Sequence, residues 1–347
     1  MKKIILFILL IFVVSCSIDD PVSDTGSPTI IKVEKSNVRV ADTVKIDGKY
    51  FGSKNQLSFL ILDSIKILSN SCLKWQENEI WFIIPDTAVS GKLRVVANSD
   101  TSNSIDIDVN PLPVFEFVEI YPEGFVMGSL TGNIDEKPVE LVYITKNFFM
   151  TTTEITQKLY RIVTRSNPSS EIGDNLPVNN IEWLDAVIFC NKLSKMQDLD
   201  TAYRISGADV LWDTNSNGWR LPTEAEWELS CRAGNTSDFY NTNLSDIAWY
   251  SDNSGYRMKP VASKLPNDYG LYDMSGNLWE WCYDYYSNNY YGNRNVFNPR
   301  GPKSGDRRVI RGGAFDQGTY FARSSNRSRP ENVNGNIGFR IVRNKVN

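Results

Sequence analysis

The segment 110-NPLPV-114 divides this sequence into two parts of different texture, and that division constrains the fold more than any other feature. Proline has no backbone N–H, so it cannot donate to a β-ladder and interrupts a continuous sheet. Short β-branched runs precede the segment, whereas strand-like and helical stretches are mixed after it. A chain of this length is typical of two domains.

The part before the prolines, residues 29–109, predicts an all-β sandwich. Its short apolar runs are separated by Gly, Asn, Asp and Pro and show no helical period. The runs are 29-TIIKVE-34, 43-TVKIDG-48, 57-LSFLIL-62, 79-EIWFIIP-85, 92-KLRVVAN-98 and 104-SIDIDV-109. Pro28, 48-GKYFG-52, Trp75, 80–85, Gly91 and 102-SN-103 resemble the immunoglobulin-like IPT/TIG domain. The resemblance implies a spacer or partner-binding module.

The first residues predict export. Lys2 and Lys3 precede an apolar run over 4–14, which is too short to span a bilayer and is typical of a signal peptide. The ending 13-VVSC-16 resembles the bacterial lipoprotein box, which implies a signal peptide over 1–16 and acylation of Cys16. A plain secretory signal with a chance cysteine is the alternative. The polar stretch 17–28 predicts a tether to the outer membrane or cell surface, with the membrane as a partner through the lipid anchor.

Charge and composition exclude several function classes. The formal net charge is -4 and becomes more negative once Lys2 and Lys3 are removed, which argues against a nucleic-acid partner. The chain contains no histidine. This excludes the Ser-His-Asp triad, other histidine acid/base catalysis, and histidine-ligated zinc or iron.

The cysteines beyond Cys16 form no metal motif. They are Cys72, Cys190, Cys231 and Cys282, without any CxxC spacing. An exported protein can hold disulfides. Buried thiols, or one disulfide among the last three, are the two interpretations.

Residues after Pro113 predict three helices, over 154–165, 182–196 and 223–234. Apolar positions at helical spacing support the first two, and Thr223 with Glu226 has the spacing of a capping box in the third. The stretch 213-DTNSNGWRLPTE-224 fits the EF-hand loop formula. Pro222 falls inside that loop, so an Asn/Gly turn is the better interpretation.

Several motifs in this part occur in a familiar order. They are 124-GFVMGS-129, 135-DEKP-138, 149-FMTTTEIT-156, 181-IEWLDAVIFCN-191, 219-WRLPTEAEWELSCRAG-234, 269-YGLYDMSGNLWEW-281, 311-RGGAF-315 and 338-GFR-340. Residues 114–343 resemble the formylglycine-generating enzyme (sulfatase-modifying factor) family. The resemblance implies an α+β, loop-rich domain of the C-type-lectin-like fold, following the N-terminal sandwich.

The ligands for the family's oxidative chemistries are missing. Members resembling the sulfatase activator use two cysteines after the RGG-type motif to bind copper, but no cysteine follows Cys282 here. Asp316 and Gln317 stand near the position of the first thiol, and they cannot replace two thiolates on a soft cuprous ion. Members resembling sulfoxide synthases bind iron through three histidines. Neither copper nor iron is therefore expected.

The resemblance also implies a calcium site. Its ligands would be the side chains of Asp273 and Glu280 and the backbone carbonyls of Gly276 and Leu278, an oxygen set suited to this hard cation. Strand alternation would turn Glu280 away from its neighbouring tryptophans, which then pack in the core. In the alternative interpretation, Glu280 only hydrogen-bonds its own turn. A second site near Asp246 is not expected, because the sequence after it is shortened.

Two groups of residues are candidates for ligand binding. Tyr285, Tyr286, Tyr290 and Tyr291 lie among small polar residues, as in recognition loops, although tyrosine also fills the core of loop-rich folds. The second group follows the RGG-type motif and comprises Arg311, Asp316 and Gln317. Arginines that could line an anionic cleft follow, although the resemblance implies that several of them are buried and paired instead. They are Arg307, Arg308, Arg311, Arg323, Arg327 and Arg329.

These observations predict an envelope-anchored lipoprotein whose family domain is non-catalytic and acts in binding or assembly at the cell surface, with a protein or glycan as ligand. The alternative is an oxidoreductase of the formylglycine-generating or pyoverdine-maturation type that uses carboxylates or unrecognised chemistry. The sequence alone does not distinguish the binding protein from the oxidoreductase.

Overall fold

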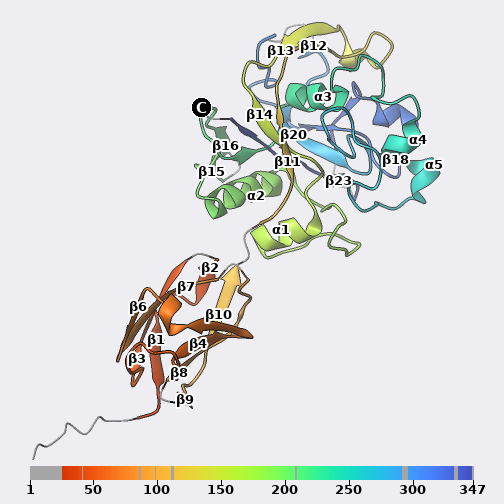
Figure 1. Cartoon of the computed structure of the whole chain (residues 1–347). Helices are drawn as coiled ribbons and strands as arrows, with labels where there is room; N and C mark the ends of the chain where they lie inside the picture. Colours follow the sequence, from red (N-terminus) through yellow and green to blue (C-terminus); the bar gives the residue numbers. More distant parts are fainter. Residues whose placement is uncertain are drawn as a thin grey trace, which may run out of the picture. The chain divides into compact units, whose positions relative to one another are not determined.

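The computed structural model describes residues 26–345 except 41, 86, 98, 111–112, 208, 291–295 and 332–334. The chain forms two compact units, Met1–Pro111 and Leu112–Asn347 (Figure 1). The predicted signal peptide, Cys16 and most of the tether lie outside the described residues. Within the described part of the chain, no helix is both long enough and apolar enough to span a bilayer.

The first unit consists of two β-sheets. One has the strand order β1-β3-β7-β6, and the other has the order β2-β10-β8-β4-β5 with β9 paired to β8. The strands are β1 (Thr29–Val33), β2 (Asn37–Arg39), β3 (Thr43–Lys49), β4 (Phe59–Leu62), β5 (Ile65–Leu68), β6 (Lys74–Gln76), β7 (Glu79–Ile83), β8 (Gly91–Ala97), β9 (Asp100–Thr101) and β10 (Ile105–Asn110).

Side-chain alternation explains how these sheets pack. In β3, Val44 and Ile46 are buried while Lys45 and Asp47 point outward. Both sheets contribute to one core, in which Ile46 from the first joins residues such as Leu60 from the second. The six predicted runs all contain strands, and the strands missed by the prediction are short. The unit is thus a two-sheet β-sandwich.

The second unit combines two four-stranded sheets with hairpins and helices. The sheet orders are β11-β14-β24-β17 and β22-β21-β20-β23. The strands of these sheets are β11 (Phe117–Ile120), β14 (Phe148–Thr151), β17 (Trp219–Arg220), β20 (Trp279–Tyr285), β21 (Arg308–Arg311), β22 (Arg327–Ser328), β23 (Ile337–Gly338) and β24 (Val342–Asn344). The remaining strands pair as β12 (Gly124–Met127) with β13 (Glu140–Tyr143), β15 (Tyr203–Ser206) with β16 (Asp209–Trp212), and β18 (Ala248–Trp249) with β19 (Ser275–Gly276).

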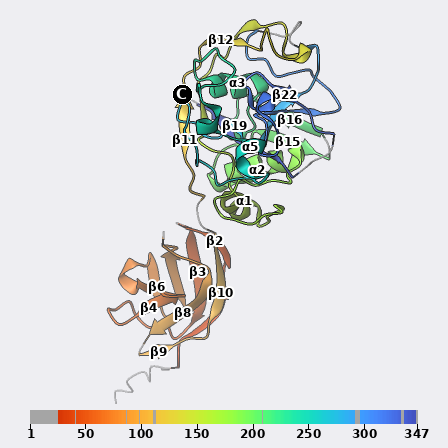
Figure 2. The ribbon, with the colours of Figure 1, turned by 90° about the vertical axis from the view of Figure 1, so that its right-hand side faces the viewer.

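The three predicted helices are confirmed with shifted ends. The α-helices are α1 (Gln157–Thr164), α2 (Trp183–Met196), α3 (Glu224–Arg232), α4 (Leu244–Ile247) and α5 (Ser251–Ser254), and the 3-10 helices are η1 (Ser69–Ser71), η2 (Ile134–Glu136) and η4 (Thr319–Ala322). Thr223 and Glu226 form the predicted capping box of α3. The β15–β16 hairpin lies beside α2 in both views (Figures 1 and 2), where Asn191 donates to the Tyr203 carbonyl over 2.7 Å.

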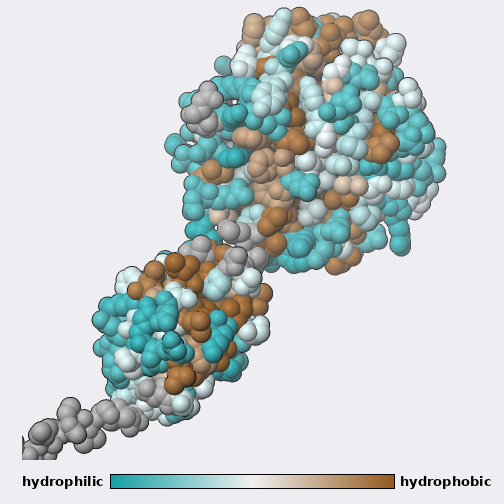
Figure 3. All heavy atoms as spheres, in the orientation of Figure 1, coloured by the Kyte–Doolittle hydropathy of each residue, from teal (hydrophilic) through white to brown (hydrophobic). Residues whose placement is uncertain are grey.

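Two hydrophobic clusters fill the second unit. One joins α1 and α2 to the tryptophans of β20, and the other packs α3, with its buried Cys231, against β14 and the buried Cys282 of β20. Apolar side chains also reach the surface. Figure 3 shows hydrophobic residues gathered over the β12–β13 hairpin, where Val126 and Leu141 are 49% and 48% exposed.

Candidate functional site

Strand β20 places its residues on two opposite faces, as predicted. Trp279 and Trp281 lie in the same hydrophobic cluster as α1 and α2, while Cys282 lies in the other cluster. The indole N–H of Trp281 donates to the Ile181 carbonyl over 2.8 Å. Glu280 therefore faces away from the tryptophans, toward the interior of the unit.

Glu280 belongs to a buried charged cluster that also contains Glu154, Asp273 and Arg340. The Arg340 guanidinium donates to both carboxylate oxygens of Glu280 over 2.7 Å, and the indole N–H of Trp227 donates to one of them. This geometry contradicts the interpretation in which Glu280 only hydrogen-bonds its own turn. Glu280 is instead half of a buried ion pair.

The other two acids have raised pKa values. Burial raises the pKa of Asp273 to about 6, although the Ala262 N–H and Arg340 oppose the change. Burial, together with the charges of Asp273 and Glu280, raises the pKa of Glu154 well above its usual value. One guanidinium cannot neutralise three buried carboxylates, so protons or a cation must balance the cluster.

The backbone between these acids takes unusual conformations. Asp273, Gly276 and Asn277 all have positive φ, between 55° and 77°. At Gly276 a Cβ atom would lie 2.1 Å from the Trp249 carbonyl oxygen. Only glycine allows β19 to pair this closely with β18.

Asp273 and Glu280, the predicted calcium-ligating side chains, are both buried and their charges interact. Within the described residues, however, no group of three or more acidic, cysteine or histidine side chains is arranged to hold a metal ion. Glu280 also already accepts three hydrogen bonds. A calcium ion would rely on Asp273 and the two carbonyls, and would share Glu280 with Arg340.

A separate cleft of about 310 Å³ lies where β20, β21 and β23 meet the C-terminal loops. It is lined by Trp279, Ile310, Gln317, Ser328, Arg329, Pro330, Glu331, Asn336 and Ile337. Asn336 donates to both oxygens of Asp316 over 3.0 and 3.1 Å, and Trp279 donates to Gln317 over 2.9 Å. Hydrogen bonds thus hold Gln317 in the lining of this cleft and Asp316 beside it, against the lining residue Asn336.

The structure separates the predicted tyrosines from the cleft lining. Tyr285 lies under the Arg308 guanidinium at 3.5 Å, and the Tyr286 hydroxyl donates to Asp135 over 2.7 Å. Tyr290 is half-buried, and Tyr291 lies outside the described residues. Tyr286 connects indirectly to the cleft, because the Arg329 guanidinium lies 4.6 Å from its ring.

The prediction that Arg311 takes part in ligand binding is wrong. Its side chain is fully buried, forms an ion pair with Glu228 and lies 3.6 Å from Glu224. Arg323 and Arg327 are also buried, paired with Glu136 and Glu224 over 2.7 Å. These arginines connect loops to the core, so they do not line an anionic cleft.

The turn interpretation of 213–224 is confirmed. The Asp213 carboxylate accepts a hydrogen bond from the Asn215 N–H over 3.0 Å, closing a local turn. Glu224 begins α3 and binds Arg327 through both oxygens. It is therefore engaged as a structural residue rather than as the last ligand of a calcium loop.

The cysteines are buried free thiols, the first of the two interpretations. This holds for Cys72, Cys190, Cys231 and Cys282. Burial raises the pKa of Cys72 and of Cys231 to about 11 and that of Cys190 further. None of them resembles a reactive thiolate.

Sequence reasoning missed three partners in these sites: Glu154, Arg340 and Asn336. Glu154 and Arg340 occur inside the quoted motifs 149-FMTTTEIT-156 and 338-GFR-340, but nothing local indicates that they meet Glu280. Asn336 lies outside every quoted motif. Long-range pairing was the information that the sequence patterns lacked.

Comparisons with known proteins show which family the second unit resembles. The family model described as "Sulfatase-modifying factor enzyme 1-like domain" matches residues 107–345. The "Chaperone protein LppX" of Paenibacillus barcinonensis is 28% identical over 262 residues, covering 64% of this chain and 88% of that protein. The "Formylglycine-generating enzyme" of Streptomyces coelicolor is 35% identical over 191 residues, or 48% of this chain and 52% of that enzyme, so the match spans about half its length.

A solved structure shows the same domain architecture. The "Treponema denticola variable protein 1" superposes with a TM-score of 0.62 at 30% identity, covering 67% of this chain and 95% of that protein. The overlap is consistent with the predicted α+β, C-type-lectin-like domain.

Proposed function

The chain belongs to the sulfatase-modifying factor enzyme 1-like family, and from that premise we propose that it is an envelope lipoprotein whose family domain binds a protein or glycan without catalysing a reaction. One observation carries the proposal. Asp316 and Gln317, which stand near the position where the resemblance places the first catalytic thiol, are held at a cleft by Asn336 and Trp279.

The chemistry of the chain supports binding over thiol-based oxidation. Copper-dependent oxidation in the family needs two thiolates, and no cysteine follows Cys282. The thiols that the structure describes are buried, and their raised pKa values disfavour the thiolate form.

The surroundings of the cleft are suited to recognition. Amide, carboxylate and guanidinium groups from Gln317, Glu331 and Arg329 lie around it. Nearby, Phe321 packs edge-on against Trp279 at 6.3 Å and remains 40% exposed. A few fixed polar groups beside exposed aromatic rings are typical of ligand-binding surfaces. A relative named as a chaperone protein is compatible with work done through binding.

A capture experiment tests this proposal. We expect the immobilised chain to retain a component of an outer-membrane fraction, and the Asp316→Ala/Gln317→Ala variant to retain at least about tenfold less, because loss of polar contacts in a desolvated site costs 1–3 kcal/mol or more. Asp209→Ala on the exposed β15–β16 hairpin is the matched control and should retain as much as the unmodified chain. Equal retention by all three proteins would contradict the assigned cleft.

The enzymatic alternative predicts a different result. Incubation with a cysteine-containing sulfatase peptide should yield no aldehyde, with or without added copper. An aldehyde product that disappears in Asp316→Ala would replace the binding proposal with the carboxylate-dependent oxidoreductase.

The lipid anchor at Cys16 would place the cleft at the outer membrane or cell surface. The polar stretch 17–28 would then act as the tether between anchor and folded units. Metabolic labelling with a radioactive fatty acid should mark the chain and leave Cys16→Ser unlabelled.

We further propose that calcium stabilises the second unit through Asp273, Gly276, Leu278 and Glu280. Because the pKa of Asp273 is raised from 3.8 to about 6, this group's stabilisation is complete below pH 3.8 and is lost as pH rises through about 6. A bound cation would reverse that loss. Calcium should therefore raise the melting temperature more at pH 7.5 than at pH 5, and Asp273→Asn should remove the difference, as measured by calorimetry with a chelator as reference. An equal calcium effect at both pH values would contradict this assignment.

A further inference from the structure

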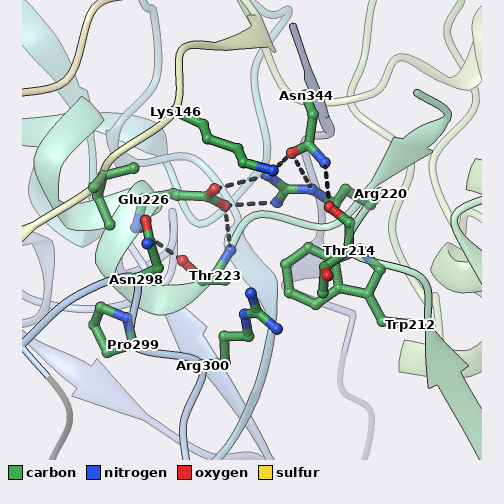
Figure 4. Close-up of a pocket in the computed structure, with 11 residues that line it drawn as sticks. Lys146, Trp212, Thr214, Arg220, Thr223, Glu226, Asn298, Pro299, Arg300 and Asn344 are labelled. Carbon is green, nitrogen blue, oxygen red and sulfur yellow. Dashed lines mark hydrogen bonds and ion pairs between the residues drawn. The ribbon is translucent and has the colours of Figure 1, made fainter. Parts of the chain in front are cut away.

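A second cavity, of about 70 Å³, lies away from the cleft and shares none of its lining residues. Six parts of the second unit meet here: the β13–β14 connection, residues 212–214 at and after the end of β16, β17, the start of α3, residues 298–300, and β24 (Figure 4). The lining includes the charged residues Lys146, Arg220, Glu226 and Arg300 and the indole of Trp212.

The cavity carries two cations beyond its internal ion pair. Arg220 is neutralised, since its guanidinium donates to both oxygens of Glu226 over 2.6 and 2.7 Å. Lys146 and Arg300 have no such partner in the lining, where Glu226 is the one carboxylate and is paired with Arg220. The cavity is therefore net positive.

Trp212 adds an unpaired donor. Its Nε1 atom is buried and has no hydrogen-bond partner among the described residues. The Arg300 guanidinium lies 4.9 Å from its ring and that of Arg220 lies 4.7 Å away. A buried N–H without an acceptor costs about 1–3 kcal/mol, so an acceptor in the cavity would be favoured.

The cavity lining has more positive charge and hydrogen-bond donors than its own acceptors balance. A ligand with a negatively charged hydrogen-bond acceptor would suit it. We propose that this cavity binds an oxyanion, a phosphate, sulfate or carboxylate group, with Lys146 and Arg300 providing charge and the Trp212 N–H an oriented hydrogen bond. Charge-assisted hydrogen bonds of this kind are short and strong.

The volume of the cavity limits the size of the ligand group that can enter it with the oxyanion. On this measure one water needs about 10–15 Å³, so about 70 Å³ has room for a small charged group and little more. A neighbouring cavity of about 500 Å³ shares Lys146, Thr214 and Asn344 with it and is otherwise lined by Thr145, Asn147, Asn215 and Lys345. Hydroxyl and amide groups are suited to a sugar, so the ligand is an oxyanion-bearing polar molecule such as a sugar phosphate.

Nuclear magnetic resonance of the indole N–H groups tests the site directly. The chain has nine tryptophans, and the Trp212 signal is the one missing from Trp212→Phe, which keeps a ring at this position. Inorganic phosphate should shift that signal saturably, whereas chloride at equal ionic strength should not. Glucose 6-phosphate should bind more tightly than phosphate, and glucose should not shift the signal.

Matched variants separate this site from general electrostatics. Lys146→Met/Arg300→Gln should weaken phosphate binding at least about tenfold, since both charge contacts are lost. Lys303→Met removes an exposed charge outside the lining and should leave the affinity unchanged. No saturable shift, or an equal affinity in the double variant, would overturn the proposal. The capture result at Asp316 and Gln317 is independent of either outcome.

Discussion

Replacing Arg340 with methionine should destabilise the second unit by about 3–5 kcal/mol, because breaking a buried ion pair leaves an uncompensated charge. The guanidinium is fully buried and provides the two hydrogen bonds of 2.7 Å to Glu280. Without it, Glu154, Asp273 and Glu280 share a buried site with no cation from this cluster. Chemical denaturation followed by near-ultraviolet circular dichroism measures the change.

Two further variants distinguish a charge effect from lost packing. Lys345→Met breaks an ion pair that is 39% exposed at the lysine, and should cost less than about 1 kcal/mol. Arg340→Met combined with Glu280→Met should recover part of the loss, since apolar replacement of a whole buried pair is often neutral. If the double variant is less stable than Arg340→Met alone, the charge explanation is wrong.

The second large effect is expected at Gly276. In Gly276→Ala the new Cβ would approach the Trp249 carbonyl oxygen to 2.1 Å at a φ of +77°. We expect a loss of roughly 2–6 kcal/mol, adding about 1–3 for backbone strain and about 1–3 for overpacking. Thermal unfolding of the purified chain measures it, and the predicted calcium response should disappear with the β18–β19 pairing.

Gly255→Ala is the matched control for this substitution. Gly255 has a φ of +65°, yet no atom lies within 4 Å of its Cβ position. Only the left-handed backbone is then penalised, at about 1–2 kcal/mol. Equal losses at Gly276 and Gly255 would show that β19 can move away from Trp249.

Local sequence patterns correctly predicted those helices and strands that are determined mainly by their own residues. The capping box at Thr223 fixed the start of α3, and β-branched runs located the main strands of the sandwich. Short strands such as β5 and β6 were missed, because three or four residues carry too little periodicity. The partners in the two mixed sheets could not be derived either, since β24 pairs with β14 and β17, each more than one hundred residues earlier in the chain.

Some features of the candidate site could likewise be predicted from the sequence, and others could not. Alternation along β20 correctly placed Glu280 opposite the tryptophans. It could not show that Arg340 binds Glu280, or that Arg311 is buried between acids of α3. The sequence around an arginine does not show whether its side chain is buried. Only the fold determines whether the guanidinium contacts solvent, a ligand or a carboxylate.

The position of Arg340 along the chain has a consequence for synthesis. Its acidic partners come from residues 154, 273 and 280, whereas the arginine and the central strand β24 come from residues 340–344. A chain that stops before residue 340 would hold three acids and no counterion at the centre of the unit. Such a product should lack the stabilising ion pair and unfold more readily than the full-length chain.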